Sequence, residues 1–194
     1  MTVSFQIEQL GIVRVLRLLS EDGTNRLTSA RVLDLTDALR DLAGDPAPLI
    51  LTGNDKYFSA GAELAEIAAL TGPAAFRFSQ MGQTLLNLVE RFPAPIHAAI
   101  SGYCMGGGLD LALACHRRIA SPRAVFGHRG AALGLITGWG GTQRLPRLVG
   151  PAKALEMFVA AEKLHAAQAW KIGLVDEVAE DPVGAAAALL RPQQ

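Results

Sequence analysis

Three consecutive glycines followed closely by an acid constrain the fold of this chain more than any other feature. They stand in "SGYCMGGGLD", which runs from Ser101 to Asp110. The stretch lies between the apolar runs "PIHAAI" and "LALACHRRIA", whereas a flexible linker would be more polar. We therefore interpret the glycines as a backbone feature of a folded core, where the lack of a Cβ lets another group approach the main chain.

Strand and helix signals alternate along the chain. The expected strands are 3–9 and 12–19 (joined as a hairpin through Leu10-Gly11), 48–53, 96–100, 117–121, 124–127 and 174–179. The expected helices are 29–42 (capped by Thr28 or Ser29), one that begins near Ala62, 74–91, 109–115, 142–148, 152–161 and 166–172. This alternation of helices with apolar strands predicts an α/β fold, in a single domain over 1–194, with helices over a mostly parallel sheet.

Two segments repeat the order of buried strand, glycine-containing turn and helix. They are "LILTGNDKYFSAGAEL" (49–64) and "IHAAISGYCMGGGLDL" (96–111). In an open α/β sheet, ligands bind where strand ends meet helix starts, and two helix starts aimed at one point offer two N–H donors to one oxygen anion. In the second segment, Asp110 stands one helical turn after the glycines. The alternative is that the glycines only permit close helix–sheet packing and that the acid favours the helix dipole.

Composition narrows the class of protein. Half of the 194 residues are hydrophobic and the formal net charge is zero, which is typical of a globular enzyme and gives no basis for binding nucleic acid or a membrane surface. No apolar run approaches the length of a membrane span, and "MTVSFQIEQLG" does not resemble a signal peptide. We expect a cytoplasmic protein in which Cys104 and Cys115 are reduced and buried.

Other sequence patterns exclude several kinds of site. The glycine patterns of dinucleotide and P-loop sites and the GxSxG nucleophile elbow are absent. The four histidines have no metal-ligand spacing, so no metal site is expected. His97 lies in an apolar strand and is interpreted as a core residue. His128 follows a strand end, which makes it a candidate to line the site.

Four segments together resemble the enoyl-CoA hydratase/isomerase, or crotonase, family. They are "YFSAGAEL" (57–64), "PIHAAISGYCMGGGLDLALACHRRIAS" (95–121), "LGLITGWGGTQRLPRLVGPAKALEM" (133–157) and "AAQAWKIGLVDEV" (166–178), and their order and spacing match as well. The resemblance implies a spiral of stacked ββα units, assembled as a homotrimer or a hexamer. It implies an acyl-CoA thioester as substrate and an enolate held in an oxyanion hole. Coenzyme A enters as part of the substrate, and no separate cofactor is implied.

The resemblance also assigns residues. It implies that the N–H groups of Ala62 and Gly107 form the oxyanion hole and that Asp110 is the acid/base. The residues implied to contact the acyl chain or the coenzyme A portion are Ala60, Glu63, Leu64, Tyr103, Met105, Gly106 and Gly130.

Departures from the family pattern bear on the reaction. Hydratases of the family carry two glutamates. The first position is Asp110 here, and the second, in an F-G-x-x-E pattern, is Gly130. A proline that usually precedes Gly138 is Thr137, and an acid that some dienoyl isomerases carry near Gly138 is absent. Proton transfer along the acyl chain is therefore favoured over full hydration, which needs two proton-transfer groups.

The end of the sequence leaves further questions open. The C-terminal helical segment of the family is expected to be largely absent, replaced by "PVGAAAALLRPQQ". Three functions fit: an active acyl-CoA enzyme with Asp110 as sole carboxylate, a decarboxylase or thioesterase of the same fold, and a non-catalytic CoA-thioester-binding or assembly subunit.

Overall fold

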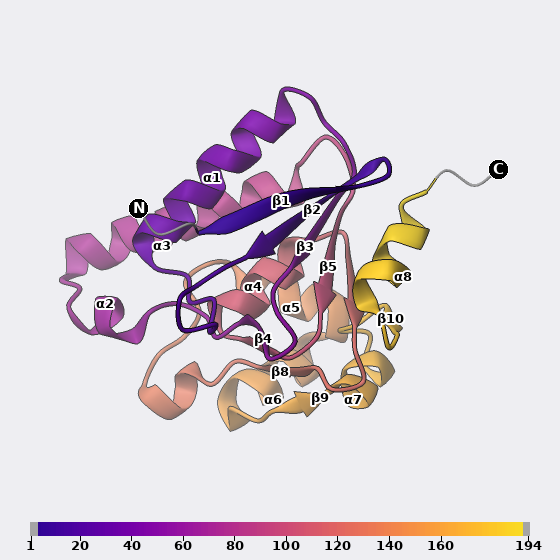
Figure 1. Ribbon diagram of the computed structural model, residues 1–194. Helices are drawn as coiled ribbons and strands as arrows, with labels where there is room; N and C mark the ends of the chain where they lie inside the picture. The colour runs from indigo at the N-terminus through magenta and orange to yellow at the C-terminus, as the bar shows by residue number, and fades with distance from the viewer. Residues whose placement is uncertain (1–3, 192–194) are drawn as a thin grey trace.

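The computed structural model describes residues 4–191 and contains two sheets (Figure 1). The first has the strand order β1-β2-β3-β5-β7-β10, and the second has the order β4-β6-β8-β9. The strands are β1 Phe5–Leu10, β2 Val13–Leu18, β3 Leu49–Thr52, β4 Tyr57–Ser59, β5 Ile96–Ile100, β6 Tyr103–Met105, β7 Arg117–Ala120, β8 Val125–Gly127, β9 Leu164–His165 and β10 Glu177–Val178. Among the strand pairs of residues 4–191, only β1–β2 and β8–β9 are antiparallel.

A strand, strand, helix unit repeats along the chain. β3 and β4 lead to α2 and α3, β5 and β6 lead to α4, and β7 and β8 lead through a short 3-10 turn to α5. The helices are α1 Ser29–Ala43, α2 Leu64–Ala68, α3 Gly72–Glu90, α4 Gly107–Ala114, α5 Gly141–Val149, α6 Pro151–Ala160, α7 Ala166–Lys171 and α8 Pro182–Leu189, with the 3-10 turn at Gly130–Leu133. The first strand of each pair joins the large sheet and the second joins the small one, so the chain winds as a spiral of ββα units.

The large sheet has an apolar layer on each face. Alternate side chains of a strand point to opposite faces, so Leu49 and Leu51 of β3 pack beneath α1, α3 and α4 while Ile50 points the other way. There Ile50 meets Ala186 and Ala187 of α8. Figure 1 shows α8 on the side of the sheet opposite α1 and α3. Burial on both faces explains the continuous apolar runs of the central strands.

Most expected elements are confirmed. The β1–β2 hairpin, β3, β5 and α1 with Thr28 as its N-cap all occur near their expected positions. β4 and β6, of three residues each, were missed, and the expected last strand is reduced to the two residues of β10. Val3 of the first expected strand and residues 192–194 of the C-terminal segment lie outside the described residues.

The helix expected near Ala62 begins two residues later. Ala62 instead pairs in a parallel bridge with Leu27, and α2 starts at Leu64 with Glu63 as its N-cap. The Glu63 side chain accepts a hydrogen bond from the Ala65 N–H at 3.2 Å. The helix therefore begins slightly later than expected, because residue 62 pairs with Leu27 and stays outside it.

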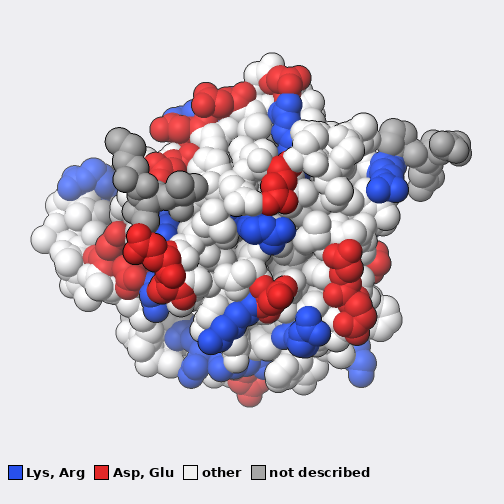
Figure 2. Space-filling model, in the orientation of Figure 1, with Lys and Arg blue, Asp and Glu red and all other residues white. Residues whose placement is uncertain are grey.

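The described residues also bear on the expectations from composition. No helix among them has the length and apolar character needed to cross a bilayer. Figure 2 shows acidic and basic side chains interspersed over the visible face. Cys104 and Cys115 are free and buried, and burial raises the pKa of both thiols, that of Cys115 to about 12.

Candidate active site

A cavity of about 460 Å³ opens where the two glycine-containing turns meet. Its wall includes the turn from Ala60 to Ala62, the start of α4, residues of α2 and α3, and the segment 128–139. Much of the wall is apolar, with Leu64, Ile67 and Phe78 among its side chains. A concave, largely apolar space with a few converging polar groups is typical of a small-molecule site.

The amides of Ala62 and Gly107 lie next to each other in this wall. A Cβ built at position 107 would lie 3.4 Å from the Ala62 nitrogen, and one at Gly61 would lie 3.2 Å from the Gly107 nitrogen. Within residues 4–191, neither amide donates a hydrogen bond to a turn or loop acceptor. Two neighbouring N–H groups are therefore available to one acceptor in the cavity.

Gly61 is required for this approach of the two turns. Its φ is +95°, a conformation that favours glycine, and a Cβ there would lie 2.7 Å from the Met105 carbonyl oxygen. The Gly61 carbonyl accepts from the Leu27 N–H at 2.8 Å. The missing side chain thus lets the turn at 59–62 pack against the strand that leads into α4.

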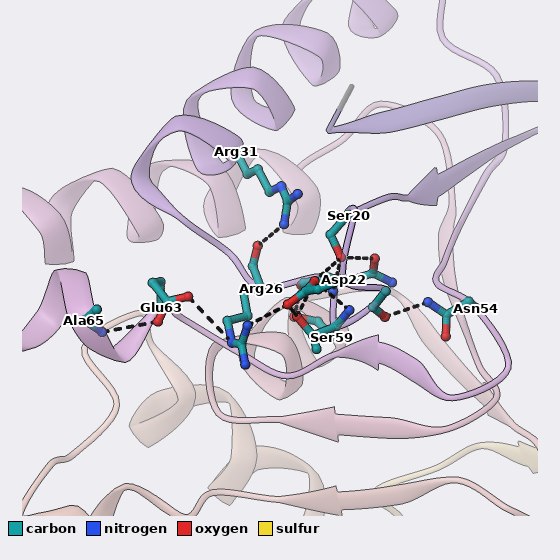
Figure 3. Close-up of polar contacts among 11 residues, drawn as sticks. Ser20, Asp22, Arg26, Arg31, Asn54, Ser59, Glu63 and Ala65 are labelled. Carbon is teal, nitrogen blue, oxygen red and sulfur yellow. Dashed lines mark hydrogen bonds and ion pairs between the residues drawn. The ribbon is translucent and has the colours of Figure 1, made fainter. Parts of the chain in front are cut away.

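A polar network fixes the turn at 59–62 from outside the cavity (Figure 3). The Ser59 hydroxyl accepts from the Gly61 N–H at 3.1 Å and donates to the Asn25 carbonyl at 2.7 Å. The Asn25 side chain donates to the Tyr57 and Phe58 carbonyls at 3.0 and 3.2 Å. The segment before α1 therefore holds the turn that presents the Ala62 amide.

Charged residues extend this network toward the surface. In Figure 3, Arg26 lies between Asp22 and Glu63, with nitrogen-to-oxygen distances of 2.7 and 3.6 Å. Hydrogen bonds from the Thr24 N–H and hydroxyl, and then from Ser20, hold the pKa of Asp22 well below its usual range. These charged groups, Glu63 included, order the segment before α1 and are not part of the cavity wall.

Helix α4 brings the second amide and a carboxylate to the cavity. Gly106 has φ +49°, and its N–H donates to the Gly127 carbonyl at 2.9 Å, which ties the start of α4 to the end of β8. The Gly107 amide is then at the N-terminus of α4, where unpaired N–H groups and the helix dipole favour negative charge. Asp110 follows in the first turn and is 1% exposed.

The two oxygens of Asp110 have different surroundings. Oδ2 accepts a hydrogen bond from the Thr137 hydroxyl. Oδ1 lies 3.2 Å from Nε2 of His128, but this contact is not a hydrogen bond, and neither atom has a hydrogen-bond partner among the described residues. The cavity therefore contains a buried carboxylate with one oxygen fixed and the other uncommitted.

Trp139 packs the back of the cavity against two glycines. A Cβ at Gly107 would lie 2.6 Å from the indole, and a Cβ at Gly82 of α3 would overlap it. The indole N–H donates to the Phe78 carbonyl at 3.2 Å, and the centroids of the Phe78 and Trp139 rings are 5.1 Å apart. Trp139 fixes the distance between α3 and α4 and closes the space behind the Gly107 amide.

Gly130 lies at the start of a tight turn that has no room for a side chain. The Leu135 N–H donates to the Gly130 carbonyl at 2.8 Å, and a Cβ at position 130 would lie 2.8 Å from the Leu135 carbonyl oxygen. A glutamate at this position would need a different course of residues 130–135.

The structure brings together most of the residues singled out from the sequence. The cavity wall contains Ala60, Ala62, Leu64, Met105, Gly106, Gly107, Asp110, His128 and Gly130. Glu63 and Tyr103 are outside it: Glu63 caps α2, and the Tyr103 ring lies 5.4 Å from the Tyr57 ring. Within residues 4–191, no group of three or more metal-ligating side chains comes together.

Sequence reasoning gave no role to Thr137, Trp139 or Phe78. Thr137 drew notice only as a departure from a usual proline. Thr137 and Asp110 are 27 residues apart in the sequence, and no local sequence pattern predicts a contact over such a separation. Phe78 and Trp139 are 61 residues apart, so their contact could not be predicted from a local pattern either.

Comparison with known proteins gives the same family throughout. The model of the family described as enoyl-CoA hydratase/isomerase matches residues 9–191. A crotonyl-CoA hydratase of Syntrophomonas wolfei is 42% identical over 159 residues, which are 80% of this chain and 61% of that protein. The fatty acid oxidation complex subunit alpha of Shewanella halifaxensis is 40% identical over 165 residues, which are 82% of this chain but 23% of that protein. The chain thus spans less than two thirds of the length of these relatives.

Solved structures agree in the fold. DspI of Pseudomonas aeruginosa has a TM-score of 0.92 and 34% identity, over 97% of this chain and 79% of that one. An enoyl-CoA hydratase from Bacillus anthracis has a TM-score of 0.88 and 34% identity, over 96% of this chain and 73% of that one. With its ββα spiral, its paired amides and this similarity over nearly the whole sequence, the chain belongs to the enoyl-CoA hydratase/isomerase family and has the crotonase fold.

Proposed function

We propose that the protein acts on an acyl-CoA thioester through an enolate whose oxygen is bound by the Ala62 and Gly107 amides. The observation that carries this proposal is the convergence of the two amides on a cavity that also holds Asp110. Removal of an α-proton from a thioester places negative charge on the carbonyl oxygen. Two N–H donors, of which the Gly107 amide is at a helix N-terminus, stabilise that charge where it develops.

In this proposal Asp110 is the group that takes and returns the proton. Its carboxylate lines the cavity, and the Thr137 hydroxyl holds Oδ2 so that Oδ1 faces the site. One carboxylate can remove a proton from one carbon of the acyl chain and deliver it to another. Isomerisation or α-proton exchange therefore needs a single carboxylate.

Full hydration of a double bond is less favoured. It needs one group to take a proton from water and another to protonate the α-carbon, and each such role is worth roughly 10²–10⁴-fold in rate. Position 130, which carries the second glutamate in the family pattern, is Gly130 here. The names of the relatives, a crotonyl-CoA hydratase and a fatty acid oxidation subunit, support the acyl-CoA class of substrate.

The apolar wall is proposed to hold the acyl chain. Leu64, Ile67 and Phe78 line the cavity, and aliphatic carbons buried against them would be removed from water. The remaining coenzyme A portion would leave the cavity past the turn at 59–62, close to Glu63. We also propose that the chain assembles as a homotrimer or hexamer, as the family resemblance implies.

Two reactions test the function. The first is deuterium wash-in at the α-carbon of a saturated acyl-CoA in D₂O, and the second is hydration of a short trans-2-enoyl-CoA. We expect wash-in by the wild-type protein and little hydration. Asp110→Asn keeps the shape of the side chain and should abolish wash-in while acyl-CoA still binds.

The outcomes separate the alternatives. Binding of acyl-CoA without wash-in would favour the non-catalytic binding subunit. Wash-in that survives Asp110→Asn undiminished would remove Asp110 from the mechanism. Hydration with a turnover number of about 1–10³ per second, typical of enzymes, would refute the preference for proton transfer.

A further inference from the structure

His128 is a buried histidine beside Asp110, and the proposed function gives it no role. Its side chain is 4% exposed and follows β8 into the cavity wall. Nε2 of the ring lies 3.2 Å from Oδ1 of Asp110. Within residues 4–191 both atoms lack a hydrogen-bond partner. Buried polar atoms without partners are uncommon and carry a free-energy cost, so this pair is free to bind a third group or to share a proton.

Neighbouring residues fix the geometry of the pair. The Thr137 hydroxyl holds Oδ2 of Asp110, which leaves Oδ1 as the oxygen that faces His128. The Phe158 ring of α6 lies 5.1 Å from the imidazole. The residue before His128 is Gly127, whose carbonyl accepts the Gly106 N–H. The hydrogen bond between Gly106 and Gly127 therefore fixes the backbone next to the imidazole relative to the start of α4.

His128 is the one residue of the described cavity wall, other than Asp110, whose side chain is of a kind that both accepts and gives up a proton. The ionisable residues that line the cavity are Asp110, His128 and Arg129. An arginine guanidinium stays protonated and accepts no hydrogen bond, whereas an imidazole can gain or lose a proton. A second proton-transfer group in this site must therefore be His128 or a water molecule.

We infer that His128 is a second proton-transfer group of the site, a relay that exchanges a proton with Oδ1 of Asp110 and does not itself act on the substrate, so full hydration remains less favoured. This inference rests on the proposed function. As the α-carbon–hydrogen bond breaks, its proton goes to Oδ1 of Asp110 and its electron pair goes into the enolate. The proton then passes from Oδ1 to Nε2 of His128, which leaves a carboxylate beside an imidazolium. Reprotonation of the acyl chain runs these transfers in reverse, with this proton or with one that the imidazolium has exchanged with solvent, so no further reactant is needed.

The pair differs in charge from two carboxylates. An Asp–His pair carries one negative charge fewer, so the negative enolate forms next to a less repulsive environment. A proton on the imidazole also sits at a group whose N–H exchanges with solvent. Proton transfer between substrate and D₂O should therefore depend on His128 as well as on Asp110.

The test compares His128→Gln with Asp110→Asn and with His116→Gln, a control at an exposed histidine outside the cavity wall. Glutamine is polar and of similar size but takes up no proton. We expect His128→Gln to slow deuterium wash-in roughly 10²–10⁴-fold, the range for one acid–base group, without change in the Kd for the saturated acyl-CoA. His116→Gln should behave as wild type.

Chemical rescue distinguishes proton transfer from a structural role. In His128→Ala the lost ring leaves space next to the existing cavity, and free imidazole added to the assay can enter it. Recovery of wash-in with added imidazole, but not with added benzene, is expected if His128 transfers protons. A residue that only supports the fold would show no such recovery, and this arm remains informative even where His128→Gln is poorly folded.

The outcomes keep the two proposals apart. If wild type exchanges the α-proton, Asp110→Asn does not, and both His128 variants exchange like wild type, the role of His128 is wrong while the proposed function stands. Loss of wash-in in His128→Ala without any recovery on addition of imidazole also contradicts it. If wild type exchanges no α-proton in any acyl-CoA, the proposed function fails, and the role of His128 fails with it.

Discussion

In the proposed function, Gly107 must leave room both for a ligand oxygen and for an aromatic ring. The position of its missing side chain is 3.4 Å from the Ala62 amide nitrogen and 2.6 Å from Trp139. A methyl group there would displace the indole or move the amide. The missing side chain is thus needed for packing against Trp139, and it also leaves the N–H pair open, so the two explanations of the glycine stretch are compatible.

A matched pair of glycine variants separates these two roles. We predict that Gly107→Ala slows α-proton exchange by about 10²–10³-fold, the usual effect of losing one oxyanion donor. Gly82→Ala also crowds Trp139, but from α3 and away from the amides, and should reduce stability by about 1–3 kcal/mol. Thermal unfolding and deuterium wash-in are measured for both. Equal loss of exchange in the two variants would mean that Trp139, rather than the amide pair, controls the rate.

At the scale of the element, Arg144 joins α5 to α3 behind the cavity. It is 8% exposed, and its guanidinium donates to Glu90 at 2.6 Å and to Asn87 at 2.9 Å. It also donates to the Trp139 carbonyl at 3.2 Å. One side chain of α5 thus binds polar groups of α3 and of the turn that carries Trp139.

Removal of Arg144 should cost much more stability than removal of a surface arginine. We predict that Arg144→Met lowers the free energy of unfolding by about 1–3 kcal/mol, because its partners lose a charged donor in a partly buried place. Arg40→Met is the control: Arg40 pairs with Asp37 at 3.0 Å on the exposed face of α1 and should contribute less than about 1 kcal/mol. Urea unfolding measures both. An Arg144 variant as stable as the Arg40 variant would contradict this role.

His97 makes the contact between β5 and α8 sensitive to pH. The side chain is 5% exposed, and its Nδ1 has no partner among the described residues. Burial lowers the pKa of His97 below its usual 6.5, and a hydrogen bond to the Ala186 backbone offsets this in part. The neutral form is therefore favoured in the folded protein.

The sign of the pH dependence follows from this shift. The contribution of His97 to stability is complete above pH 6.5, the usual value in an unfolded chain, and is lost as pH falls toward the lowered folded pKa. We predict that the Tm of wild type falls more between pH 7.5 and pH 5.5 than the Tm of His97→Val. Parallel curves for His97→Val and wild type would show that His97 does not titrate with unfolding.

Elements with a strong local signal could be predicted from the sequence, and those fixed by distant contacts could not. β3 and β5 are apolar runs, and α1 has Thr28 as a cap, so their sequences suffice. β4 is three residues long and pairs with β6 across the chain, and Ala62 is held by Leu27. The same distinction applies to the site. The two amides and Asp110 belong to local sequence motifs and could be predicted. The contact of Thr137 with Asp110 and the packing of Trp139 against Gly82 and Gly107 depend on how the ββα units stack.

At the scale of the whole molecule, α6 and α7 carry large exposed apolar side chains. Leu155 and Val159 of α6 are 63% and 69% exposed, and Trp170 of α7 is 57% exposed. Figure 1 shows these helices at the end of the molecule opposite α1. Leu155 and Val159 are four residues apart and so share one helix face, while Ala154 and Met157 are buried. Such a surface suits contact with another copy of the chain.

We predict that the protein is a trimer or hexamer that Val159→Glu dissociates. A charge in an apolar interface must be desolvated without a partner, which disfavours association. Leu33→Glu, at a 53% exposed leucine on α1, is the control and should leave the assembly intact. Light scattering gives the mass of each. A wild-type monomer at micromolar concentration would contradict the assembly, and a Val159→Glu protein of unchanged mass would move the interface elsewhere.

The position of Trp139 has a consequence for spectroscopy. The sequence has two tryptophans, and they differ sharply: Trp139 is 3% exposed in the cavity wall, whereas Trp170 is mostly exposed. A Trp170→Phe protein would have a single indole, and that indole lies directly behind the Gly107 amide. Its fluorescence would respond to an acyl group or enolate that enters the cavity. The molecule thus contains its own optical reporter, able to follow site occupancy in real time without a label.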